Sequence, residues 1–146
     1  MSKIVIVSGF FNPLHGGHLN MIEAASELGD KLIVVVNNDV QQVIKKDKVI
    51  LTEQNRARLM NAIKHVDEVV IAIDSDPPVI KTLEMIAKKY PDDELIFANG
   101  GDRDSVKAIP EGEVCGKYHI KMVFGVGGNE KADSSTRINQ ALGHKK

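Results

Sequence analysis

Short runs of apolar, mostly β-branched residues recur along the chain, and stretches with helical periodicity separate most of them. We expect strands at residues 4–7, 32–36, 69–73, 95–98 and 121–124. Helices are expected at residues 18–28, 52–65, 78–90 and 134–142, whereas segment 102–118 fits neither pattern clearly. Strands that alternate with helices are joined by right-handed βαβ crossovers, which produce a parallel sheet. The predicted fold class is α/β, with a doubly wound, five-stranded parallel sheet in a single domain over residues 1–146.

Charge and cysteine content narrow the class of protein. The sequence has 19 Lys and Arg against 20 Asp and Glu, a formal net charge of −1, which argues against a nucleic-acid partner but leaves a local basic patch open. The apolar run near the start, Ile4–Val7, is far too short for a signal peptide or a membrane span. Cys115 is the only cysteine, so no internal disulfide can form. We therefore expect a cytoplasmic protein with no membrane partner.

The loops that follow the strands are the places to look for a binding site. In a Rossmann-like sheet, ligands bind beyond the carboxyl ends of the strands, where the strand order reverses. These loops are residues 8–17, 37–52, 74–77, 99–104 and 125–134, and they hold most of the glycines and polar clusters.

The loop after the first strand carries the strongest chemical signal. It reads Ser-Gly-Phe-Phe-Asn-Pro-Leu-His-Gly-Gly-His over residues 8–18, and its two histidines, His15 and His18, open the first helix. Backbone N–H groups at a helix start attract anions, and glycines let a phosphate approach the backbone closely. The loop is neither a P-loop nor a Gly-x-Gly-x-x-Gly dinucleotide fingerprint. Two other interpretations are a turn with solvent-facing histidines and a zinc site, although no third ligand is evident.

The same loop resembles the signature Gly-x-Phe-(Asp/Asn)-x-x-His-x-Gly-His of the cytidylyltransferase-like nucleotidylyltransferases. The matching residues are Gly9, Phe11, Asn12, His15, Gly17 and His18. The Asn-Pro pair is also similar to the nicotinate-mononucleotide adenylyltransferase branch. Here Asn12 stands where many members have aspartate.

Later segments extend the resemblance to residues 3 to about 140. Residues 28–39 are similar to the second strand and loop of glycerol-3-phosphate cytidylyltransferase and heptose-phosphate adenylyltransferase. Arg56 and the Val-Asp-Glu-Val at 66–69 match these enzymes too. Residues 100–102 resemble their Gly-Asp after the fourth strand, and Ser134-Ser135-Thr136 resembles their closing motif at the start of the last helix.

The resemblance implies a mechanism, in which an acceptor phosphate attacks the α-phosphorus of ATP or CTP and pyrophosphate leaves. It implies that His15 and His18 hold phosphate oxygens in the transition state, and that Lys45 or Lys46, from a loop after the second strand, neutralises pyrophosphate. Mg²⁺ is expected as a cofactor that bridges phosphates, with no dedicated protein ligands. The residues expected to bind the nucleotide are Gly9, Phe10, Phe11, Asn12, Gly17, Arg56, Gly101, Asp102, Ser134, Ser135 and Thr136.

The acceptor is expected to be a small phosphorylated sugar or polyol, because 146 residues leave no room for a separate acceptor domain. The resemblance implies a role in the synthesis of lipopolysaccharide or other cell-envelope precursors. The resemblance also suggests a homodimer. Two alternatives stay open: a nucleotide-binding regulatory module without turnover, and a mononucleotide- or pantetheine-type adenylyltransferase of the same family.

Overall fold

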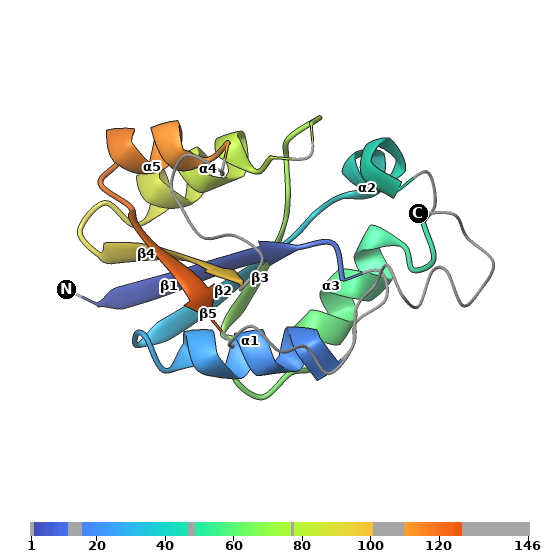
Figure 1. Ribbon diagram of the computed structural model, residues 1–146, viewed down its shortest axis with the longest axis horizontal. Helices are drawn as coiled ribbons and strands as arrows, with labels where there is room; N and C mark the ends of the chain where they lie inside the picture. Colours follow the sequence, from blue (N-terminus) through green and yellow to red (C-terminus); the bar gives the residue numbers. More distant parts are fainter. Residues whose placement is uncertain (1, 12–15, 47–48, 77, 101–109, 127–146) are drawn as a thin grey trace.

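The computed structural model describes residues 2–11, 16–46, 49–76, 78–100 and 110–126 (Figure 1). The strands in these ranges are β1 Lys3–Gly9, β2 Lys31–Val36, β3 Glu68–Ile71, β4 Glu94–Gly100 and β5 Lys121–Val126. The helices are α1 Gly16–Ser26, α2 Asp39–Lys46, α3 Glu53–Asn61, α4 Ile80–Lys89 and α5 Gly112–Lys117.

The strands form one parallel sheet in the order β3-β2-β1-β4-β5, which confirms the predicted fold class. The central strand β1 pairs with β2 on one side and with β4 on the other. Its residues Ile4–Val7 are at most 1% exposed, as expected for a strand that helices cover on both faces. The chain builds the sheet outward from β1 in one direction and then returns to build the other half. The carboxyl ends of β1 and β4 therefore mark the switch point where ligands bind in such sheets.

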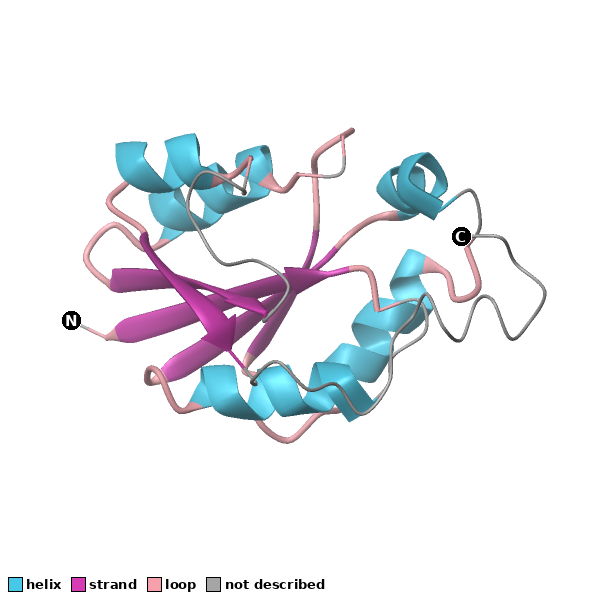
Figure 2. Ribbon diagram, in the orientation of Figure 1, coloured by secondary structure: helices cyan, strands magenta, loops and turns pink. Residues whose placement is uncertain are grey.

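Helices cover both faces of the sheet, with α1 and α3 on one face and α4 and α5 on the other (Figures 1 and 2). Because side chains alternate along a strand, Ile4 and Ile6 join the core beneath α4 and α5, while Val5 and Val7 join the core beneath α1 and α3. Cys115 is buried in the first of these cores. Burial, followed by the nearby Glu111 carboxylate, raises the pKa of its thiol to about 12, so Cys115 is a packing residue and not a nucleophile.

Helix α2 lies beyond the carboxyl ends of the strands (Figure 2), and its residues were predicted to be loop. Its polarity is inverted: Val40, Val43 and Ile44 are 60%, 49% and 53% exposed, whereas Gln41 and Gln42 are buried. The spacing of these apolar residues fits a helix, but it predicts that the apolar side is buried, whereas the structure exposes that side. The predicted loop origin of Lys45 and Lys46 is wrong, since both are the last residues of α2.

Several predicted boundaries also differ. Helix α3 ends at Asn61 rather than near residue 65, and α4 begins at Ile80 rather than 78. Helix α5 lies in the segment that had no clear pattern. The first helix ends at Ser26 rather than 28, so Gly29 comes three residues after its end. A Cβ at Gly29 would lie 2.7 Å from the carbonyl oxygen of Lys3, so this glycine allows a close approach to β1. The predicted helix 134–142 lies outside the described residues.

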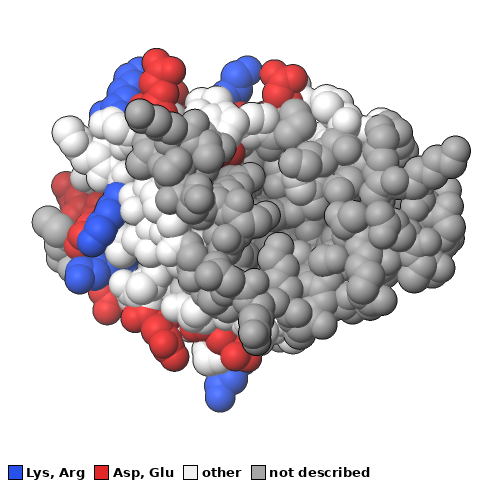
Figure 3. All heavy atoms as spheres, in the orientation of Figure 1, with Lys and Arg blue, Asp and Glu red and all other residues white. Residues whose placement is uncertain are grey.

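On the described part of the face in Figure 3, acidic and basic side chains are intermixed, and neither kind forms a patch of one charge. Within the described ranges, no helix combines the length and the apolar character that a membrane crossing requires.

A charged cluster joins the amino ends of β2 and β3 to the end of α4. Glu68 accepts hydrogen bonds from Tyr90 Oη at 2.8 Å, from Lys31 Nζ at 3.3 Å and from Lys89 Nζ at 3.3 Å. Lys31 Nζ also donates to Tyr90 Oη at 2.8 Å and lies 4.6 Å from the centroid of its ring. This cluster lies at the sheet edge opposite the switch point, so we assign it to stability.

Replacing Glu68 by glutamine should destabilise the protein at pH 7 by no more than about 1 kcal/mol, because the cluster is partly exposed. Burial by itself would raise the pKa of Glu68, but the hydrogen bonds from Tyr90, Lys31 and Lys89 together hold the pKa below its ordinary value of 4.5. A lowered carboxyl pKa stabilises the fold above the unfolded-state pKa, and this stabilisation is lost as the pH falls. Urea unfolding of both proteins should therefore show a difference at pH 7 that shrinks below pH 4.5. Glu27→Gln, at an exposed position, is the control, and a difference that persists in acid would contradict the assignment.

Candidate active site at the carboxyl edge of the sheet

The loop after β1 makes a tight turn at Phe11, whose φ is +51°. A non-glycine residue in this left-handed region costs about 1–3 kcal/mol, so the surroundings must hold it. The ring of Phe11 is 1% exposed and packs over Gly9, where a Cβ would lie 2.8 Å from Phe11 Cζ. The described structure thus gives Gly9 a packing role, and its predicted contact with nucleotide stays a prediction.

His18 lies in the first turn of α1, two residues after its start at Gly16. Its ring meets the ring of Phe11 edge-on, with centroids 4.8 Å apart and an angle of 77° between the planes. The side chain is half-buried, and Gly17 precedes it in the same turn. Backbone N–H groups at a helix start attract anions, so the position of His18 agrees with the predicted contact to phosphate, which stays a prediction.

Arg56, near the start of α3, is buried among backbone carbonyls. Nη1 donates to Phe10 O at 2.7 Å and to Asn37 O at 2.6 Å, and Nε donates to Leu51 O at 2.9 Å. Nη2 forms an ion pair with Asp39 Oδ1 at 2.7 Å, and the arginine side chain is 0% exposed. The guanidinium therefore binds the protein itself and joins the loops that follow β1 and β2, and its predicted contact with nucleotide stays a prediction.

Helix α2 is fixed to its neighbours mainly at its start. Asn38 Nδ2 donates to Ala72 O and to Asp74 O, each at 2.9 Å, and Gln41 Nε2 donates to Asp76 O at 2.6 Å. The Asp39 N–H donates to Glu53 Oε1 at 2.9 Å. These hydrogen bonds hold the start of α2 between the loop after β3 and the start of α3. They therefore fix the direction of the helix, whose last residues are Lys45 and Lys46.

Two further polar residues at the same edge support the loops after β3 and β4. The Asp74 carboxylate, 6% exposed, accepts from the N–H groups of Lys81 at 2.7 Å and Thr82 at 3.1 Å and so caps the start of α4. Asn99, 3% exposed, donates from Nδ2 to Phe97 O and to Val123 O at 3.2 and 3.3 Å, where the pairing of β4 and β5 is irregular. Asp74 and Asn99 lie in the segments 74–77 and 99–104, which were expected to hold a binding site, but neither was predicted as a site residue.

Several predicted site residues lie outside the described residues. They are Asn12, His15, Gly101, Asp102, Ser134, Ser135 and Thr136. The structure therefore brings together Gly9, Phe10, Phe11, Gly17, His18 and Arg56, and it places Lys45 and Lys46 on the neighbouring helix α2.

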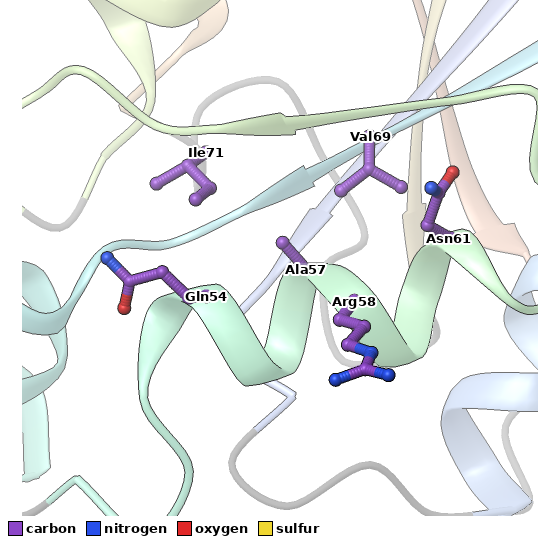
Figure 4. A pocket seen from close by; sticks show the side chains of 6 residues that line it. All are labelled: Gln54, Ala57, Arg58, Asn61, Val69 and Ile71. Carbon is purple, nitrogen blue, oxygen red and sulfur yellow. The ribbon is translucent and has the colours of Figure 1, made fainter.

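An open groove of about 570 Å³ lies elsewhere, between α3 and β3 (Figure 4). It is lined by Gln54, Ala57, Arg58, Asn61, Val69 and Ile71, and none of these was predicted to bind a ligand. As for metals, no cluster of three or more His, Cys, Asp or Glu suited to an ion is found among the described residues.

Comparison with known proteins identifies the family. The family model named cytidylyltransferase-like matches residues 6–141. The chain belongs to the cytidylyltransferase-like family. This confirms the resemblance inferred from the loop after β1 and the later motifs. The family and its relatives also confirm the predicted enzyme class, a nucleotidyltransferase.

Two curated relatives illustrate the range of the family. The FAD synthase of Pyrococcus abyssi is 42% identical over 103 residues, which cover 68% of this chain and 64% of that protein. The bifunctional protein HldE of Koribacter versatilis is 38% identical over 125 residues, which cover 83% of this chain and 24% of that protein. The chain thus spans just under two thirds of the first relative and about a quarter of the second.

Solved structures share the fold. The lipopolysaccharide core biosynthesis protein from Thermoplasma volcanium GSS1 has a TM-score of 0.69 and 26% identity, with 91% of this chain and 100% of that chain covered. A bifunctional NMN adenylyltransferase/ADP ribose pyrophosphatase from Francisella tularensis has a TM-score of 0.66 at 19% identity, over 97% of this chain and 42% of that one. The second likeness shows the fold alone.

Proposed function

We propose that the protein transfers a nucleoside monophosphate from ATP or CTP to a small phosphorylated acceptor and releases pyrophosphate. The observation that carries this proposal is the family match over residues 6–141 together with the position of His18 at the start of α1, beside the switch point of the sheet. The alternative of a nucleotide-binding module without turnover has no specific observation in its favour.

The reaction is a single displacement at phosphorus. An oxygen of the acceptor phosphate forms a bond to the α-phosphorus, and the bond from that phosphorus to the bridging oxygen of the β-phosphate breaks. Such chemistry requires positioning and charge neutralisation rather than a protein nucleophile. His18, and with it His15, would donate hydrogen bonds to oxygens of the reacting phosphate. Lys45 or Lys46, at the end of α2, would neutralise the pyrophosphate, and Ser134, Ser135 and Thr136 would bind its outer phosphates.

We expect Mg²⁺ to bind to the protein together with the triphosphate. The described residues hold no cluster of acidic or histidine ligands for a resident ion, and Asp39 and Asp74 already accept hydrogen bonds from the protein. Mg²⁺ keeps several waters and binds through substrate phosphates with few protein ligands, so this donor set suits an ion that the substrate carries.

The relatives suggest two classes of acceptor. A sugar or polyol phosphate agrees with the likeness to a lipopolysaccharide core biosynthesis protein. Flavin mononucleotide is the second candidate, because the FAD synthase relative is 42% identical over 103 residues and FAD contains this mononucleotide. Because FAD contains an adenylyl group, the FAD synthase relative favours ATP as the first triphosphate to test.

Turnover tests the proposal directly. Purified protein with Mg²⁺, one of ATP and CTP, and one acceptor from a panel of sugar phosphates, polyol phosphates and flavin mononucleotide should release pyrophosphate. Release is expected only when triphosphate and acceptor are both present, and added pyrophosphate should reverse the reaction. Pyrophosphate is measured by a coupled assay and the product by mass spectrometry. Tight nucleotide binding with no pyrophosphate from any acceptor would instead support the regulatory module.

A further inference from the structure

Arg56 connects its own helix α3 to two segments of the candidate site that are distant in sequence. Its guanidinium reaches the carbonyl of Phe10 after β1, the carbonyl of Asn37 after β2 and the carboxylate of Asp39 at the start of α2. The ends of β1 and β2 are level there, since Gly9 pairs with Val36 and the Asn37 N–H donates to Gly9 O at 2.9 Å. One buried side chain therefore fixes how the loop after β1 sits relative to α2.

A short route leads from this arginine to His18. The bond from Nη1 holds Phe10 O at 2.7 Å, and the next residue, Phe11, is the one with φ at +51°. That turn sends the Phe11 ring into the core, where its exposure is 1% and its edge contact with His18 spans 4.8 Å between centroids. A strained turn persists only when its surroundings hold it. Loss of the hydrogen bond to Phe10 O should therefore let the rings of Phe11 and His18 move.

We propose that Arg56 is a positioning residue, which orients His18 through Phe10 and Phe11 and sets the start of α2 through Asp39. The role in catalysis rests on the proposed function, whereas the effect on the His18 ring does not. The nucleotide is then bound by the loops that Arg56 holds and not by Arg56 itself.

Lysine cannot replace the guanidinium in this position. Arg56 uses three nitrogens in one plane to bind four acceptors at 2.6–2.9 Å. A lysine ammonium is a single point charge on a flexible stem and cannot reach all of these acceptors together. Arg56→Lys therefore keeps the positive charge but loses the planar set of hydrogen bonds to the four acceptors. Arg58→Lys is the matched control, because Arg58 lies two residues further along α3, is exposed and lines the groove of Figure 4.

The experiment has two readouts on folded protein, well below the Tm of each variant. With the acceptor found active for the wild type, Arg56→Lys should lower kcat by roughly 10–100-fold, the effect of displacing a catalytic group by about 1 Å. The KM for triphosphate should change much less. In a ¹H–¹³C NMR spectrum, the Cε1–H resonance of His18, identified by its loss in His18→Ala, should move by more than its linewidth. The resonances of the exposed His65 and His119 should stay in place, and Arg58→Lys should change neither readout.

Either readout can overturn the proposal. If a folded Arg56→Lys protein leaves the His18 resonance in place, Arg56 does not orient His18, and if it leaves kcat unchanged, Arg56 does not position the site for catalysis. If neither readout changes and only the Tm falls, Arg56 only stabilises the fold. If Arg56→Lys does not fold, Phe11→Leu tests the next link, since leucine keeps most of the buried volume and removes the ring edge. An unmoved His18 resonance in a folded Phe11→Leu protein would then exclude the route. A wild-type chain without turnover would refute the proposed function and leave the NMR result valid.

Discussion

His18→Ala should lower kcat by roughly 10²–10³, which is the usual cost of removing one hydrogen-bond donor to charge that develops in a transition state. The affinity for nucleotide should fall much less, because this contact strengthens as negative charge builds on the phosphoryl oxygens. Stability should be nearly unchanged, since the imidazole is only half-buried at the first turn of α1. Steady-state kinetics, calorimetric titration with triphosphate and thermal unfolding measure the three quantities.

His65→Ala is the matched control for this prediction. His65 is exposed and lies between α3 and β3, away from the loop after β1, so its loss should leave kcat, affinity and Tm as they are. The prediction would be contradicted if His18→Ala unfolded at a lower temperature while the folded molecules turned over at the wild-type rate. His18 would then be a packing residue.

Phe11→Ala should destabilise the protein by about 3–5 kcal/mol, the range for deleting a buried phenylalanine ring. The ring is among the largest fully buried side chains and joins the core beneath α1 and α3. This is a large fraction of the usual total stability of about 5–15 kcal/mol. Urea unfolding at 25 °C should show the loss as a lower midpoint. Because the ring also contacts His18, the folded fraction should lose activity as well.

Leu59→Ala provides the comparison for an apolar residue on the surface. Leu59 is 44% exposed on α3, so its truncation should cost much less than that of Phe11. If Phe11→Ala cost no more than Leu59→Ala, the ring would not be a core residue, and the turn at φ +51° would need another cause.

The sequence by itself determined the strands, the parallel sheet and the family. The run Leu32–Val36 is short, apolar at every position and rich in β-branched residues, which is typical of a strand covered on both faces. The motif around His18 is a local signal as well, because its glycines, histidines and Asn-Pro pair are neighbours in sequence. Such features need no knowledge of distant residues, so they could be predicted before the fold was known.

Only the tertiary structure decided the roles of α2 and Arg56. Helix α2 buries glutamines and exposes valines, since Gln41 finds its partner at Asp76, which is 35 residues away in sequence. Arg56 is charged and follows three polar residues at the start of its helix, so it resembles a surface residue or a phosphate ligand in the sequence. Its acceptors, up to 46 residues away, come together because parallel strands end at one edge of the sheet. Hydrogen bonds between segments distant in sequence decide which polar side chains are buried, and these bonds cannot be predicted from the order of residues alone.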